Sequence, residues 1–117
     1  KVAMVDASLI NGSTYKVAFL ATRTIAPTDT IVKQGFVYGV DMADSDLVLE
    51  NVGKTAGALN KTVKVAYADN SYEQTSLVYG VGGNNAGHSA NAVAFVTVKA
   101  ADGSINTVYS EMASYNY

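Results

Sequence analysis

Apolar and polar residues alternate along most of this chain with the two-residue period of half-buried β-strands. Over residues 61–67, valine or tyrosine stands at every second position, with polar or small residues between. The pattern predicts further strands over 1–10, 14–24, 31–40 and 72–81, and a short one over Leu47–Val52. No stretch has the apolar period of a helix, so we expect a chain made almost entirely of strands.

The strongest local signal is a hairpin formed by residues 91–100 and 105–117. Asp102 and Gly103 stand between its arms, and this pair is common in tight turns because glycine accepts positive φ at low cost. The period leaves open which face of the first arm is buried. Phe95 lies on one face, and the other carries Ala92, Ala94, Val96 and Val98.

These seven or eight strands, separated by turn signals at short intervals, predict an all-β fold. The continuous apolar helical faces of a βαβ fold are missing from the sequence. We therefore expect an antiparallel two-sheet β-sandwich, rather than a barrel, as one domain over residues 1–117.

Two stretches resemble fibronectin type III-like and immunoglobulin-like modules of bacterial surface proteins. Residues 35–39, Gly-Phe-Val-Tyr-Gly, are similar to their third strand, and residues 92–98 and 107–111, on either side of Asp102-Gly103, to their last two strands. The resemblance implies a non-catalytic module that positions neighbouring domains of the same chain or binds a protein partner. The sequence departs from these families in having no tryptophan for the core and no tyrosine corner before residues 93–98.

Composition narrows the classes of partner. Of 117 residues, 15% are charged, below the usual ~25%. The 8 Lys and Arg are spread singly and the net charge is −2, so we expect no nucleic-acid partner. No apolar run approaches the ~20 residues that cross a bilayer, so we expect no membrane insertion. The uncharged polar bias and the start at Lys1 without Met suggest a module excised from a larger exported protein, secreted or at the cell surface.

Tyrosine is the abundant aromatic residue, with 8 copies against 3 Phe and no Trp. Exposed aromatic rings can stack on the C–H faces of sugars. Tyr67, Tyr72 and Tyr79 lie on adjacent predicted strands, so a small carbohydrate-binding module that holds polysaccharide is the alternative function. The competing explanation is that strands simply favour tyrosine.

An acidic loop supplies the one candidate cation site. Asp41, Asp44 and Asp46, with Glu50 nearby, offer the oxygen ligands that Ca²⁺ prefers, although their spacing is not that of an EF-hand. The competing explanation is a solvated loop. Calcium is the only cofactor that the sequence suggests, and there is no cysteine for a disulfide or a thiolate metal site.

Catalytic chemistry has little support in the sequence. His88 is the only histidine, it stands in a Gly- and Asn-rich loop, and no Gly-x-Ser-x-Gly motif accompanies it. Gly82, Gly83 and Gly87 lack the strand–loop–helix context and the Lys-Ser/Thr ending of a phosphate-binding loop. We therefore expect a protein that is not an enzyme.

Overall fold

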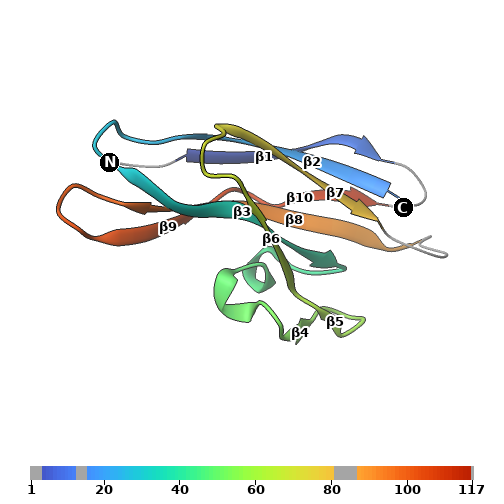
Figure 1. Ribbon diagram of the computed structural model, residues 1–117. Helices are drawn as coiled ribbons and strands as arrows, with labels where there is room; N and C mark the ends of the chain where they lie inside the picture. The colour runs from blue at the N-terminus through green and yellow to red at the C-terminus, as the bar shows by residue number, and fades with distance from the viewer. Residues whose placement is uncertain (1–3, 13–15, 81–86, 117) are drawn as a thin grey trace.

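The computed structural model describes residues 4–12, 16–80 and 87–116, and the chain forms two antiparallel β-sheets stacked as layers (Figure 1). The first sheet has the order β1-β2-β7, with β1 Met4–Gly12, β2 Lys16–Thr24 and β7 Gln74–Gly80. The second sheet has the order β10-β8-β3-β6, and β9 also pairs with β8. Its strands are β3 Thr30–Val40, β6 Lys64–Ala68, β8 Ser89–Lys99, β9 Ile105–Tyr109 and β10 Ala113–Asn116.

This architecture confirms the predicted all-β sandwich. The first two long strands and β7 form one sheet, while β3, β6, β8 and the last arm form the other. Over the described residues there are ten strands instead of seven or eight, because the expected final arm is divided into β9 and β10 and because two short strands, β4 and β5, are counted, each two residues long.

The first core lies between the two sheets. Alternate residues of β2 point into it, so Val17, Phe19 and Ala21 are buried while their neighbours are half-buried or exposed. Phe36 of β3 and Leu77 of β7 complete the contact, together with the alanine-rich face of β8 (Ala90, Ala92, Ala94, Val96 and Val98). The apolar residues that alternate in the sequence of these strands are therefore the ones that are buried in the structure.

A second core lies on the other side of the second sheet. There, residues 42–63, which we call the covering segment, contain η1 Asp44–Asp46, η2 Leu49–Asn51, β4 Thr55–Ala56 and β5 Lys61–Thr62. Figure 1 shows them as an additional layer below β3 and β6. The segment buries Met42, Leu47 and Val63 against Val37, Val93 and Phe95.

The predicted strand over Leu47–Val52 is wrong, because its centre is the 3-10 helix η2. In a 3-10 helix, residues three apart point the same way. Leu49 and Val52 therefore both pack on the second core, although in a strand they would point to opposite faces. The apolar residues of this stretch therefore pack on the face of the second sheet, and the stretch is not itself a strand of that sheet.

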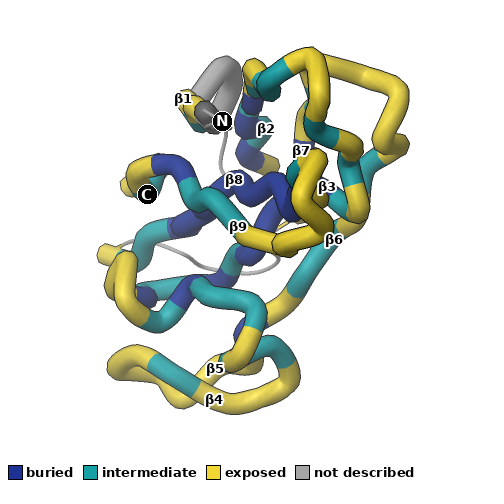
Figure 2. Tube along the Cα trace, turned by 90° about the vertical axis from the view of Figure 1, so that its left-hand side faces the viewer, coloured by how far each residue is buried: buried dark blue, intermediate teal, exposed yellow. Residues whose placement is uncertain are grey.

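Because it lies between the two cores, β8 is buried on both faces (Figure 2). Phe95 faces the second core and Ala94 faces the first, and each has 1% of its surface exposed. Both faces of the hairpin arm are therefore core, which is why its sequence shows no clear alternation.

Gly35 lets β6 lie close to β3. A Cβ atom on Gly35 would stand 2.0 Å from the carbonyl oxygen of Ala66, so any side chain would push the strands apart. Gly35 pairs with Tyr67 on one side and with Phe95 on the other. The Tyr67 ring leans across the gap onto Phe95, with ring centroids 6.0 Å apart in an edge-to-face arrangement.

One extra residue separates β9 from β10. Tyr109 pairs with Phe95 and Ala113 with Ala92, so four steps of one arm oppose three steps of β8. Ser110 fills the irregularity: its backbone N–H donates to the Ala94 carbonyl, and its Oγ accepts from the Ala94 N–H, both at 2.9 Å. The hydroxyl thus replaces the backbone acceptor that the bulge removes from β8.

Candidate functional site

The polar side chains best held in place lie where β3 ends and β8 begins, and we call Asp41, His88, Ser89 and Asn91 the Asp41 cluster. Since β3 and β8 are antiparallel, Asp41 and His88 are neighbours in space although 47 residues separate them. Asp41 has φ of 52°, a left-handed conformation that aspartate tolerates better than most residues. This turn directs its carboxylate back toward the start of β8.

The Asp41 carboxylate is fully engaged. Its Oδ1 accepts the backbone N–H of Ser89 at 2.8 Å, and its Oδ2 lies 2.6 Å from Nδ1 of His88. Burial acts to raise the pKa of Asp41, but the Ser89 N–H and the contacts with His88 outweigh it and hold this pKa below its ordinary value. The carboxylate is therefore ionised at neutral pH and accepts these hydrogen bonds as a charged group.

Asn91 joins this cluster to the covering segment and to the last strand. Its side chain is buried, its Oδ1 accepts the Met42 N–H at 2.8 Å, and its Nδ2 donates to Ser114 Oγ at 2.8 Å. A second contact from Nδ2 reaches Ser89 Oγ at 3.2 Å. The buried amide thus satisfies its polar atoms while tying β8 to segments on both sides.

The cluster has two of the parts of an acid–base triad. A carboxylate on the Nδ1 side of an imidazole orients the ring, as in serine hydrolases. The nearby hydroxyl, however, points elsewhere: Ser89 Oγ bonds to Asp41 and Asn91 and makes no hydrogen bond to the imidazole. In the described part of the chain, the arrangement works as a polar tie between β3 and β8.

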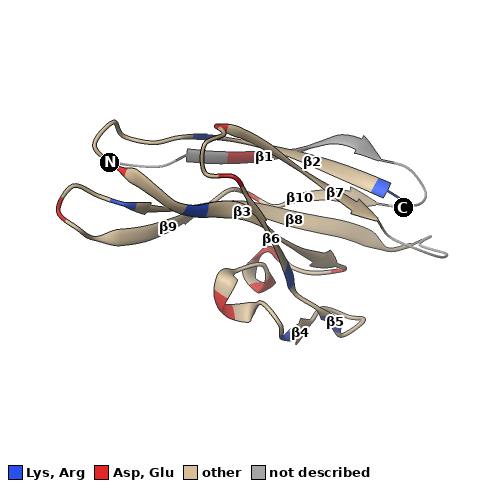
Figure 3. Ribbon diagram, in the orientation of Figure 1, with Lys and Arg blue, Asp and Glu red and all other residues tan. Residues whose placement is uncertain are grey.

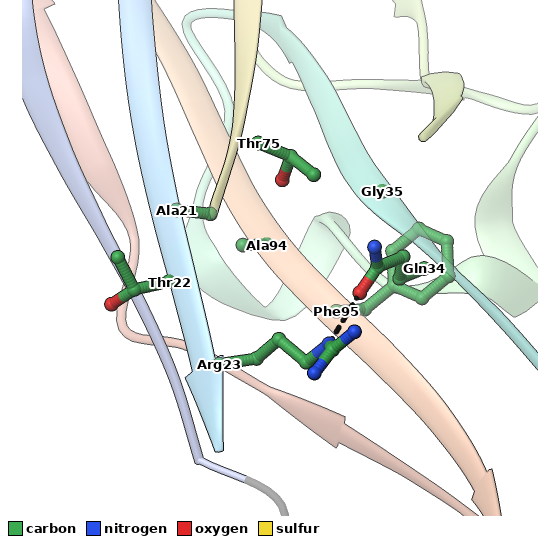
Figure 4. Close-up of a pocket in the computed structure, with 8 residues that line it drawn as sticks. All are labelled: Ala21, Thr22, Arg23, Gln34, Gly35, Thr75, Ala94 and Phe95. Carbon is green, nitrogen blue, oxygen red and sulfur yellow. Dashed lines mark hydrogen bonds between the residues drawn. The ribbon is translucent and has the colours of Figure 1, made fainter. Parts of the chain in front are cut away.

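A second polar cluster lies at the opposite end of the sandwich, around Arg23 of β2 and Gln34 of β3. The Arg23 Nε–H donates to Gln34 Oε1 at 2.9 Å, as Figure 4 shows. Gln34 Nε2 in turn donates to the carbonyls of Asp69 and Tyr72, at 2.6 and 2.8 Å. These bonds fix the β6–β7 loop where it crosses from the edge of the second sheet to the edge of the first.

A small hollow opens beside this second cluster (Figure 4). Its cavity volume is about 10 Å³, close to the least that holds one water molecule and far below an ordinary ligand pocket. Its size suits water or a single side-chain tip. The lining residues come from both sheets: Ala21, Thr22, Arg23, Gln34, Gly35, Thr75, Ala94 and Phe95.

The structure does not place the three candidate sugar-binding tyrosines on one surface. Tyr67 and Tyr72 are 62% and 61% exposed. Tyr67 pairs with Gly35, next to Gln34, and the Tyr72 carbonyl accepts a hydrogen bond from Gln34. Tyr79 packs on the first core, edge-to-face with Tyr38 at 4.8 Å between ring centroids. A stacking surface could therefore use Tyr67 and Tyr72 but not Tyr79 beside them.

The acidic candidates are also dispersed. Asp46 Oδ2 accepts the Ala43 N–H at the start of η1, while Asp41 is directed to Ser89 and His88. Asp44 and Glu50 belong to η1 and η2, whose acidic residues Figure 3 shows in red. Among the described residues, no three His, Asp or Glu side chains are grouped so that they could hold a metal ion. Calcium binding remains a prediction without a ligand cluster in this part of the chain.

Sequence reasoning missed Arg23, Gln34 and Asn91, which carry most of these contacts. The antiparallel pairing of β3 with β8 was the available signal for Asp41 and His88, because it brings the end of one strand to the start of the other.

No helix among the described residues is long and apolar enough to cross a membrane. Comparisons with protein-family models, curated proteins and solved structures gave no significant match to this chain.

Proposed function

We propose that this chain is a non-catalytic module of a secreted or cell-surface bacterial protein, which positions neighbouring domains or contacts a protein partner. The observation that carries the proposal is where the chain enters and leaves the sandwich. The start of β1 pairs with Thr24, beside the turn that leads into β3, whereas the end of β10 pairs with Ser89, at the far end of β3.

These two points lie at opposite ends of an elongated body (Figure 1), whose principal extents are 48 × 26 × 18 Å. A domain attached to each end would be held apart by the length of the sandwich. Both ends are also tied across the strands, by the Arg23–Gln34 bonds at one and by the Asp41 cluster at the other. Hydrogen bonds that join the strands in this way support a fixed distance between domains attached at the two ends.

The test is a distance measurement with two spin labels. The chain has no cysteine, so Thr24→Cys and Asn116→Cys, both at exposed positions, would be the only labelled sites. An 11-residue strand separates the ends, so we expect one narrow distance distribution centred near about 35 Å. The pair Thr24→Cys and Asn70→Cys, which lies at one end, is the control and should give a clearly shorter distance.

A broad distribution between the two ends would contradict the positioning role, because neighbours would then not be held in fixed places. Turnover of any substrate that is lost in His88→Ala would overturn the non-catalytic proposal as a whole.

The alternative function is carbohydrate binding, which the exposure of Tyr67 and Tyr72 near Gln34 favours. Retention on an immobilised polysaccharide should then fall in Tyr67→Ala and in Tyr72→Ala, since each ring supplies stacking area. Tyr67→Phe, which keeps the ring, is the matched control and should be retained like the wild type. Equal retention of all these proteins would exclude the tyrosine surface.

A further inference from the structure

Strand β7 leaves one edge of the first sheet open. Among the described residues, β2 is the only strand that pairs with β7. The register between them runs without a shift from Lys16 opposite Gly80 to Thr22 opposite Gln74. The strand is therefore regular over its seven residues, and no strand of the described ranges pairs with its other side.

The hydrogen bonds between β2 and β7 show which backbone groups of β7 point away from β2. The Arg23 N–H donates to the Glu73 carbonyl at 3.0 Å, so Glu73 points its backbone groups at β2. In an antiparallel ladder each residue turns its N–H and C=O to the same side, and successive residues alternate. The residues that turn both groups outward are therefore Gln74, Ser76, Val78 and Gly80, and all four are exposed.

Three other strands at sheet edges, β1, β6 and β10, carry features that discourage pairing, and β7 does not. The ladder of β1 has an irregularity between Leu9 and Asn11, β6 is five residues long and includes exposed Lys64, and β10 is four residues long. Short strands, bulges and lysines are the usual protections of a free edge. From Gln74 to Gly80, β7 has no charged residue and no proline.

We propose that the β7 edge pairs with the β7 edge of a second copy of this chain, antiparallel across a two-fold axis. Centred on Leu77, this register sets Ser76 opposite Val78 of the second copy and Gln74 opposite Gly80. The four outward residues of each chain then exchange about eight main-chain hydrogen bonds. The inference stands apart from the positioning role, because it concerns the side of the sandwich and not its ends.

Charge favours a second copy as the occupant of this edge. The central pairs contain only uncharged side chains, and Glu73 lies beyond the end of the strand, so the axis brings no like charges together. Pairing of this kind is isologous and stops at two chains. The irregular β1 edges at the outside of the joined sheet would not continue it.

The first test is the oligomeric state of the wild type and of Val78→Pro by sedimentation velocity over a wide range of concentration. Because the Val78 N–H points away from β2, proline removes a donor from the proposed interface while leaving the internal ladder intact. We expect a wild-type dimer whose association constant falls about tenfold or more in Val78→Pro. Val78→Thr keeps the N–H and a β-branched side chain, and should dimerise like the wild type.

The second test uses complementary charges and does not depend on proline being tolerated. Ser76→Lys/Val78→Lys sets lysines opposite lysines in the proposed register, and Ser76→Glu/Val78→Glu sets carboxylates opposite carboxylates. Each variant alone should be monomeric, with the circular dichroism spectrum of the wild type, while an equal mixture should form a heterodimer that high salt weakens.

Three results would overturn the proposal: a wild type that stays monomeric at its highest soluble concentration, a dimer that neither the proline nor the charged variants weaken, and charged variants whose mixture stays monomeric. If the β7 edge instead binds an extended peptide of another protein, the wild type should be monomeric when it is alone. That result would contradict pairing with a second copy.

Discussion

The two sheets of this sandwich have different outer faces. In the first sheet, β2 and β7 bury one face and expose the other, and Val78 of β7 is 63% exposed. In the second sheet the covering segment lies over the outer face, so that β8 is buried on both sides. The comparison shows that alternation in a strand reports the number of layers in contact with it. A regular alternation indicates one buried face, and a continuous apolar run indicates two.

The largest expected effect comes from the residue at the centre of the doubly covered sheet. Phe95→Ala should lower the free energy of unfolding by about 3–5 kcal/mol, because it removes a fully buried ring from the second core. Urea unfolding measures this change. Val78→Ala, on the open face of the first sheet, is the control and should change stability by less than about 0.5 kcal/mol. A loss below about 1 kcal/mol for Phe95→Ala would mean that the covering segment does not pack on it.

Leu47→Ala tests the covering segment from its own side. Leu47 has no exposed surface and lies in the second core, so we expect a loss of about 2–5 kcal/mol in stability. Amide hydrogen exchange should show faster exchange in residues 42–63 than in the wild type. Val17 and Phe19, which pack on the first core, should lose less protection. Equal loss of protection in both cores would show that the layers unfold as a single unit.

A smaller effect is expected from the hydroxyl of Tyr109. Its oxygen accepts the Leu49 N–H at 3.1 Å, which joins η2 to the second sheet. Tyr109→Phe leaves that N–H without its partner and should cost about 1 kcal/mol by thermal or urea unfolding. Tyr67→Phe, which removes an exposed hydroxyl from the same sheet, should have no measurable effect. Equal effects of the two variants would mean that the Leu49 contact adds no stability.

The smallest effect concerns Asp41 and depends on pH. The pKa of Asp41 is lower in the folded protein than its ordinary value of 3.8, so its ionised form favours the fold. This stabilisation is present above that ordinary pKa and is lost as the pH falls through the lowered folded value. Asp41→Asn, which tolerates the left-handed backbone, should therefore lose less stability than the wild type between pH 5 and the most acidic folded condition, as measured by Tm. Parallel acid profiles would contradict this role.

The fold could be predicted from the sequence where one layer touches a strand. The alternation over residues 14–24 and 72–81 located β2 and β7 closely, because each meets only one core. Over Leu47–Val52 the apolar residues look like those of a strand, but they pack on a sheet through the 3-10 helix η2. A period of three over six residues is too short to recognise in the sequence.

The candidate site was harder to predict, because its contacts join residues far apart in the sequence. Asn91 reads as an exposed polar residue at the start of a strand, yet it is buried, since Met42 and Ser114 supply partners from two other segments. The sequence groups Tyr67, Tyr72 and Tyr79 because they lie on adjacent predicted strands. Packing distinguishes them: Tyr79 meets Tyr38 between the sheets, while Tyr67 lies over Gly35 and remains mostly exposed.

The additional residue at Ser110 has a consequence for everything that follows it in the chain. Tyr109 and Tyr115 are both odd-numbered, so in an unbroken strand their rings would emerge on one side; here Tyr109 packs on the second core and Tyr115 on the first. An arm of the same length without this irregularity would turn the tail over, carrying Tyr115 away from the alanines of β8 and setting Ser114 opposite Ala90 in its place. Removal of the one additional residue would instead give a regular arm with Tyr115 still opposite Ala90, so the bulge at Ser110 absorbs the extra residue and keeps the last ring on the first core.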